Sequence, residues 1–405
     1  IGMEATRTDT KKNEMKYEKS ELELMTTYQL REICRREKIM NGVIHPLDKE
    51  ELIQTIMRYM GKRQDFLICD RKKGGEERVE EFLKNTRIVI KPSEELYCQS
   101  QILAYEGLSI EYYDGYTIPY KKELSGTNAF LMGSDMTLCA ILNLKEHGGR
   151  QEKLYLTKAA ELEIRETQRK DYRIFCMGRQ TSESLYHLYY GEHTILPEHI
   201  EVYSIPLIDF VVRKPVTLML PMAIDFGSVN TTAGVYLDSA YFEHVGQQAA
   251  IKNCRENEIN YTVFEDGAGE SMLLPSVIGV LAVEEEDDKL LFGYDAIRLA
   301  NASYVDEGFC VFYDVKRWIG EYEKEEEIVD RQGRRRLVKR AEILRRFFLY
   351  IIRKTENRFK CRISQVHISS PVKQKHYFRR MFREILPEYM AGQETMLDEG
   401  MAVLY

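Results

Sequence analysis

No long apolar run, no paired cysteine spacing and no internal repeat occurs in this chain of 405 residues. The lack of an apolar run, together with the polar opening IGMEATRTDTKKNEMKYEKSELE, argues against a membrane span and against a secretory leader. The eight cysteines form no CxxC pair, so neither a disulfide framework nor a zinc site is expected. These absences favour a protein of the reducing cytoplasm.

The balance of residue types is that of a folded chain. Hydrophobic residues make up 44% and charged residues 30%, which argues against disorder over most of the length. The formal net charge of −7 excludes a globally basic nucleic-acid coat but still permits a basic patch on one domain. Because the chain is longer than one ordinary hydrophobic core, two or three domains are expected.

Hydrophobic patterning divides the chain into four parts. They are a flexible N-terminal tail (1–17), a small helical module (18–62), a β-rich α+β domain (64–215) and an α/β domain (222–405). Ile1 and Gly2, ahead of Met3, are typical of residues left by cloning.

The helical module contains two amphipathic patterns joined by a polar segment. Thr26 or Thr27 is suited to cap the first helix, and Asp48 the second, which we expect to end at Gly61. The apolar residues expected to face inward are Leu30, Ile33, Cys34, Leu52, Ile53, Ile56 and Met57.

The same module resembles SAP-type helix-extended-helix modules, many of which bind DNA. Its candidate DNA contacts are Arg31, Arg35, Arg36 and Lys38, with Arg58, Lys62 and Arg63 as further basic residues. Acidic residues are as numerous, so a small docking module for a protein partner or client is the alternative.

The block 64–215 alternates short apolar runs with turn residues, which predicts strands. The clearest runs are TRIVIKP, MTLCAILNL, DYRIFCMG and HIEVYSIPLIDFVV. Two tyrosine-rich segments, YYDGYTIPY and YHLYYGEHTILPEHIEVY, are either half-buried sheet residues or an aromatic recognition surface. His187, His193 and His199 lie close in sequence, but their spacing fits no helical pair of zinc ligands.

The stretch MAIDFGSVNTTAGVYL, residues 222–237, predicts a hairpin with chemistry at its turn. Asp225 follows apolar residues and would lie near a buried sheet end, where one carboxylate suffices to hold the water shell of Mg²⁺. The turn residues Gly227, Ser228, Asn230 and Thr231 offer backbone amides and hydroxyls to phosphate. By itself the stretch fits a plain hairpin equally well.

The order of the segments that follow this hairpin is informative about the family. After this hairpin come LLPSVIGV, FGYDAIRLA, VFYDVKRWIG, EIVDRQGRRRLV, AEILRRFFLYIIRKTENRF, SQVHISSPV and LDEGMAVLY. In this order they resemble the heat shock protein 70 (DnaK-type) chaperones of the actin-like ATPase superfamily. The resemblance implies a ribonuclease H-like α/β lobe that binds ATP or ADP with Mg²⁺.

The resemblance assigns roles to further residues. Lys316 would be the catalytic lysine that reaches the γ-phosphate, and Glu399 would lie near the metal and the attacking water, beside Asp225. Pro371 and Arg379 would couple nucleotide state to the surface between domains. The chain departs from the family pattern at Val229, which replaces a phosphate-loop threonine, and at Gly400, which replaces the proline after the glutamate.

The family continues beyond the point matching Tyr405 into a second lobe that completes the nucleotide cleft, so we expect this chain to be part of a longer protein. The function expected for that protein is slow ATP hydrolysis as a conformational switch, read by partners of the N-terminal domains. The alternatives are a non-catalytic nucleotide sensor or scaffold, a SAP-type DNA-binding regulator, and an actin-like filament.

Overall fold

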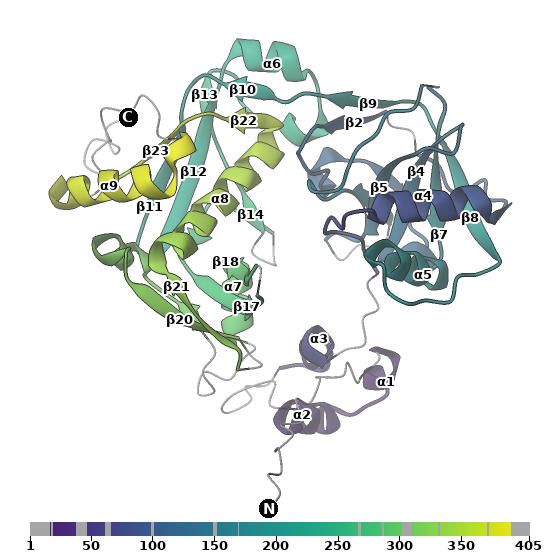
Figure 1. Ribbon diagram of the computed structural model, residues 1–405, viewed down its shortest axis with the longest axis horizontal. Helices are drawn as coiled ribbons and strands as arrows, with labels where there is room; N and C mark the ends of the chain where they lie inside the picture. The colour runs from purple at the N-terminus through teal and green to yellow at the C-terminus, as the bar shows by residue number, and fades with distance from the viewer. Residues whose placement is uncertain are drawn as a thin grey trace, which may run out of the picture.

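A computed structural model describes residues 17, 19–37, 47–60, 66–98, 101–148, 152–168, 170–265, 269–285, 287–301, 310–330, 333–370 and 372–389. These residues form a mixed α/β protein with one seven-stranded sheet and several smaller sheets. Figure 1 shows the 222–389 part on the left, the seven-stranded part on the right and the N-terminal helices below. None of the helices in the described ranges is both long and apolar enough to cross a membrane.

In its described residues the N-terminal module has three helices, whereas the sequence predicted two for the module. They are α1 (Lys19–Glu23), α2 (Thr27–Arg36) and α3 (Lys49–Met60). Thr26 caps α2, because its hydroxyl accepts the Gln29 amide at 3.3 Å. Asp48 caps α3, because its carboxylate accepts the Glu51 amide at 2.9 Å. Both capping predictions are therefore confirmed, whereas Gly61 lies outside the described residues.

The predicted inward faces of these helices are also confirmed. Leu30, Ile33 and Cys34 of α2 pack with Leu52, Ile53 and Ile56 of α3 in one buried cluster, and Met57 borders it. The periodicity of 3.6 residues was sufficient to find this core because both helices present one apolar side.

The middle part of the chain is built on a seven-stranded sheet in the order β1-β8-β7-β4-β5-β6-β3. Its strands are β1 (Arg87–Ile90), β3 (Thr117–Pro119), β4 (Thr127–Gly133), β5 (Leu138–Lys145), β6 (Lys153–Thr157), β7 (Tyr172–Met177) and β8 (His199–Leu207). A separate parallel pair is formed by β2 (Ile102–Tyr105) and β9 (Phe210–Arg213). The four predicted runs all contain strands, but the central strand β4 was not predicted from the sequence.

Helices cover one face of this sheet, and neither was predicted. They are α4 (Gly75–Asn85) and α5 (Arg179–Tyr190). Phe130 and Met132 of β4 face the cluster that contains these helices, whereas Ala129 and Leu131 face a second apolar cluster on the other side. Part of the second tyrosine-rich segment is therefore not a strand: Tyr186 and Tyr189 are buried in α5 because they recur at helical spacing.

Glu80 joins α4 to the sheet. It accepts the Leu138 amide at 2.9 Å and the Lys84 ammonium at 2.6 Å, and its carboxylate lies 3.0 Å from Arg165. Burial opposes ionisation, but these three partners together lower the pKa of Glu80.

Replacing Glu80 by glutamine is expected to reduce the free energy of unfolding by about 1–2 kcal/mol near neutral pH. The contribution of ionised Glu80 is present above its unfolded-state pKa and is lost as pH falls through its lowered folded-state pKa. The difference between variant and wild type should therefore shrink in acid, measured by urea unfolding at several pH values. Glu81→Gln, at an exposed position on the same helix, is the control; a pH-independent difference would contradict this account.

The C-terminal part contains a five-stranded sheet with the main order β13-β12-β11-β23. Its strands are β11 (Met222–Phe226), β12 (Asn230–Leu237), β13 (Glu258–Tyr261), β16 (Leu274–Pro275) and β23 (Val366–Ile368). Smaller pairings involve β10 (Val216–Leu218), β14 (Phe264–Glu265), β15 (Glu270–Ser271), β17 (Ile278–Ala282), β18 (Lys289–Phe292), β19 (Val311–Phe312), β20 (Glu325–Val329), β21 (Arg335–Lys339) and β22 (Cys361–Ile363). The hairpin β11–β12 is antiparallel, and β23 returns parallel to β11.

The α-helices in the described ranges of this part are α6 (Ser239–Val245), α7 (Tyr294–Asn301), α8 (Arg340–Phe359) and α9 (Lys375–Ile385). The long helix α8 runs across the strands in Figure 1, and its Phe347 and Phe348 contact Phe226 of β11 with ring centroids 6.0 and 5.0 Å apart. The core-facing stripe predicted for α8 is confirmed, since Ile343, Leu344, Phe347, Phe348, Ile351 and Ile352 are buried.

A buried ion pair joins the middle and C-terminal parts. Lys360, at the end of α8, donates to the Asp114 carboxylate at 2.8 Å and to the Ser109 carbonyl at 3.0 Å. The two charged side chains are 3% and 5% exposed. Asn357 adds a hydrogen bond, accepting the Ser109 amide at 3.1 Å. Nothing in the local sequence indicated this contact.

Further contacts extend the same interface. Arg362 donates to the Glu106 carbonyl at 3.0 Å, next to Gly107, whose φ of +69° suits glycine. The Arg358 guanidinium lies 4.5 Å from the centre of the Tyr113 ring, a cation–π distance. The middle part and the C-terminal part therefore share a specific, partly buried boundary.

Candidate functional site

The turn between β11 and β12 is tight and requires glycine. The Gly227 amide donates to the Asn230 carbonyl at 3.1 Å, which closes the hairpin. A Cβ at position 227 would lie 2.3 Å from that carbonyl oxygen, closer than any real contact. The role of Gly227 in this turn is therefore steric, and only a residue without a side chain fits.

Asp225 lies beside this turn but is not buried, so the prediction of a buried sheet end is wrong. Ile224 and Phe226 face the core, and strand alternation places the carboxylate between them on the opposite, exposed side. In the parallel pairing of β11 with β23, Ser369 follows directly after the partner strand and donates to Asp225 Oδ1 at 2.5 Å. Asp225 thus lies at the carboxyl ends of two neighbouring parallel strands, the edge where ligands bind in open α/β sheets.

The other predicted phosphate contacts differ in accessibility. Ser228 is exposed and Asn230 half-buried, so both are open to a ligand. Thr231 is fully buried, and its hydroxyl lies 2.9 Å from that of Ser276. Val229, the residue that departs from the family pattern, is 74% exposed and offers no side-chain hydrogen bond.

Ser276 contacts the turn from outside the hairpin. Its hydroxyl donates to the Gly227 carbonyl at 2.8 Å, and its amide donates to the Val229 carbonyl at 2.8 Å. It follows β16, which pairs with the start of β12. Neither Ser276 nor Ser369 was predicted as a site residue; each lies inside a segment on which the resemblance rests, LLPSVIGV and SQVHISSPV.

Lys316 lies on the 3₁₀ helix η5 (Val315–Glu321), with its ammonium 5.9 Å from the centre of the Phe378 ring of α9. Arg379, the predicted coupling arginine, is the next residue on α9 and is half-buried. Two residues before Lys316, Asp314 adopts a left-handed conformation with φ of 52°, which is uncommon for a residue other than glycine. Its buried Oδ1 has no hydrogen-bond partner within the described ranges.

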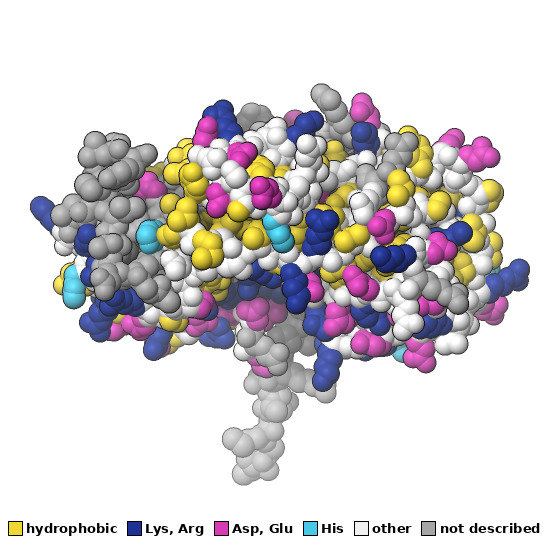
Figure 2. Space-filling view, turned by 90° about the horizontal axis from the view of Figure 1, so that it is seen from above, with side chains coloured by type: hydrophobic (Ala, Val, Ile, Leu, Met, Phe, Trp, Pro, Cys, Tyr) yellow, Lys and Arg dark blue, Asp and Glu magenta, His cyan; other side chains and the backbone are white. Residues whose placement is uncertain are grey.

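Pro371, Glu399 and Lys38 lie outside the described residues. Of the other candidate DNA contacts, Arg31 is half-buried, Arg35 lies 3.6 Å from Glu32, and Arg36 donates to the Tyr17 hydroxyl at 2.6 Å. The charges of Arg35 and Arg36 are therefore partly engaged within the module. Figure 2 shows basic and acidic side chains interspersed on the face seen from above, with no extended area of one sign.

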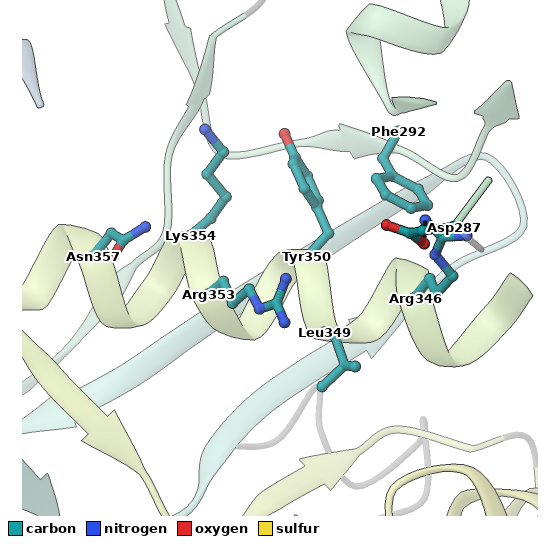
Figure 3. Close-up of a pocket in the computed structure, with 8 residues that line it drawn as sticks. All are labelled: Asp287, Phe292, Arg346, Leu349, Tyr350, Arg353, Lys354 and Asn357. Carbon is teal, nitrogen blue, oxygen red and sulfur yellow. Dashed lines mark ion pairs between the residues drawn. The ribbon is translucent and has the colours of Figure 1, made fainter. Parts of the chain in front are cut away.

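Two clefts flank α8, away from the turn. One, of about 670 Å³, lies between the two parts of the chain and is lined by Ser109, Glu161, Arg353 and Arg362 among others. The other, of about 330 Å³, appears in Figure 3, where Tyr350 and Lys354 extend from α8 on the side of Phe292. Both are lined by charged residues of either sign, and no residue of the β11–β12 turn lines either of them.

The three histidines do not converge on a metal. His187 Nδ1 lies 2.6 Å from a Glu192 carboxylate oxygen, and His199 is exposed on β8. Within the described ranges no group of three or more histidine, cysteine or acidic side chains is placed to hold a metal ion. No disulfide joins any of the eight cysteines, all of which lie within the described ranges, and burial raises the pKa of Cys34 and of Cys139 to about 11.

Comparison with protein-family models and with curated proteins finds no match to this chain.

Proposed function

We propose that the protein containing this chain binds Mg-ATP at the β11–β12 turn and hydrolyses it slowly as a conformational switch. The C-terminal part would be the first lobe of a ribonuclease H-like, heat shock protein 70-type ATPase. The observation that carries the proposal is the arrangement of Asp225. Its exposed carboxylate lies beside a glycine-dependent turn, at the carboxyl ends of two parallel strands.

This arrangement suits the phosphate end of a magnesium nucleotide. Mg²⁺ keeps most of its waters and needs only one or two carboxylates beside phosphate oxygens, a demand that Asp225 can meet. The turn amides and the Ser228 hydroxyl supply donors for the phosphate oxygens. Lys316 would supply positive charge to the transferred phosphoryl group.

The order of elements supports the same proposal. After the hairpin the chain forms the strand β17, the short helix α7, the hairpin β20–β21, the long helix α8 and the strand β23. They coincide with the segments LLPSVIGV, FGYDAIRLA, EIVDRQGRRRLV, AEILRRFFLYIIRKTENRF and SQVHISSPV, on which the resemblance rests. The contacts between the middle part and α8 would let a movement of the lobe reach the N-terminal domains and the partner, client or DNA that they recruit.

A non-catalytic nucleotide sensor is the second candidate, and two observations favour it. Val229 offers no side-chain hydrogen bond, and the Thr231 hydroxyl is already bonded inside the lobe. Hydroxyl donors for phosphate are therefore fewer than the sequence predicted, and binding without turnover would identify this function.

Replacing Asp225 by asparagine in the full natural chain is expected to weaken Mg-ATP binding by about 10- to 100-fold, because a charged hydrogen-bond acceptor contributes about 1.5–3 kcal/mol. Isothermal titration calorimetry should also show that the remaining affinity no longer depends on Mg²⁺. Glu243→Gln, at an exposed position on α6, is the matched control and should bind as wild type does. A wild-type protein that fails to bind Mg-ATP would overturn the proposed function.

A further inference from the structure

We propose that two serines outside the turn, Ser276 and Ser369, are positioning residues of the nucleotide site. Ser276 presets the turn so that its amides face the phosphates, and Ser369 fixes Asp225 so that one carboxylate oxygen faces the hydrated metal. This inference rests on the proposed function and deepens it, since it assigns the residues that shape the site before any ligand arrives.

The donor and acceptor in each hydrogen bond of the Ser276 hydroxyl can be assigned. Its single hydroxyl hydrogen is donated to the Gly227 carbonyl, so the hydrogen bond with Thr231 must be donated by the threonine. Thr231 and Ser276 are both fully buried, so water cannot replace these bonds. The buried hydroxyl of Thr231 thus contributes to the site by supporting Ser276 rather than by contacting phosphate.

The same bonds set the direction of the turn amides. Ser276 holds the carbonyls of Gly227 and Val229, which belong to the same peptide groups as the amides of Ser228 and Asn230. No cis peptide bond occurs among the described residues, and in a trans peptide the N–H group points away from the carbonyl. The amides of Ser228 and Asn230 are therefore both directed away from Ser276. Backbone amides that face one side, as these two would, can bind an anion.

Ser369 positions the Asp225 carboxylate, as Ser276 positions the turn amides. Its amide donates to the Ile224 carbonyl at 2.9 Å, which fixes its position along β11. Its hydroxyl donates to Asp225 Oδ1 at 2.5 Å, which restrains rotation of the carboxylate and leaves Oδ2 to face the ligand. A neutral donor suits this place because it orients Asp225 without neutralising the charge that attracts the cation.

Substitutions of the two serines are expected to have different effects on ATP binding. Calorimetric titration with ATP, with and without Mg²⁺, distinguishes these effects. Ser276→Ala should weaken ATP binding at least tenfold under both conditions, because the arrangement of the turn amides is lost. Ser369→Ala should raise the Mg²⁺ concentration needed for half-maximal binding several-fold and leave Mg²⁺-free binding unchanged. Ser369→Thr, which keeps the hydroxyl, should restore the wild-type Mg²⁺ dependence, and Ser239→Ala on α6 is the control.

A second measurement tests Ser276 without nucleotide. Amide hydrogen exchange of Gly227 and of residue 276, whose amides are bonded to the Asn230 and Val229 carbonyls, should be faster in ligand-free Ser276→Ala than in ligand-free wild type, while exchange in α8 stays the same. Unchanged exchange at the turn, or a Mg²⁺ dependence that Ser369→Ala leaves as in wild type, would overturn the inference. If wild type binds no ATP, the proposed function fails, yet accelerated exchange would still establish that Ser276 shapes the turn.

Discussion

Replacing Lys360 by methionine is expected to lower the free energy of unfolding by about 3–5 kcal/mol, because the change leaves the Asp114 carboxylate buried without a counter-charge. The lysine side chain is 3% exposed, so water cannot take its place. The carbonyl of Ser109, which also accepts from Lys360, would lose a partner as well. The result should be visible in urea unfolding and as a lower melting temperature.

A double variant, Lys360→Met with Asp114→Asn, separates charge from packing. It removes both charges, so the uncompensated carboxylate disappears and much of the lost stability should return. Lys324→Met is the control, since Lys324 is 61% exposed and its surface ion pair with Glu321 contributes less than about 1 kcal/mol. A loss below about 1 kcal/mol in Lys360→Met would show that the interface does not depend on this pair.

The interface between the middle and C-terminal parts would connect the two parts stiffly in the proposed switch. The contacts of Lys360, Arg362 and Arg358 with residues 106–114 join α8 and β22 to the middle part at several points. Calorimetry should therefore record unfolding of the middle and C-terminal parts together in wild type and separately in Lys360→Met. A lobe whose movement is to be read by another domain needs a stiff connection of this kind.

The local features of the fold could be predicted from the sequence. The caps at Thr26 and Asp48, the β11–β12 hairpin and the apolar stripe of α8 depend on residues within a few positions of one another. Helix α5 was missed because its aromatic residues have a high propensity for strands, although Leu185, Tyr186 and Tyr189 recur at helical spacing and Gly191 caps the helix.

In the site, too, residues within one short segment could be predicted from the sequence, whereas partners far apart in the sequence could not. Gly227 and Asp225 could be selected from one short segment, but the exposed position of Asp225 depends on which face of β11 meets α8. Ser276 and Ser369 are 49 residues from Gly227 and 144 residues from Asp225, respectively. Likewise, Lys360 and Asp114 are 246 residues apart, and no periodic pattern connects them. Such partners become neighbours only through tertiary structure.

Replacing Lys316 by alanine is expected to reduce the ATP turnover number of the full natural chain by about 100- to 1000-fold, with little change in Mg-ATP affinity. The reason is that a positive charge beside the transferred phosphoryl group interacts more strongly with the transition state than with bound ATP. Single-turnover kinetics and calorimetric binding should be measured on the same preparations, with Lys324→Ala, which removes an exposed lysine, as the control.

The pattern of loss distinguishes the roles that Lys316 can have. Slow turnover with intact binding would assign it to the chemical step, and an equal fall in affinity would assign it to ground-state binding of phosphate. Turnover that stays at the wild-type rate would contradict the catalytic role and leave the lysine as the residue that packs over Phe378. A wild-type protein that binds Mg-ATP without measurable hydrolysis would favour the nucleotide sensor, because Lys316 would then have no role in a chemical step.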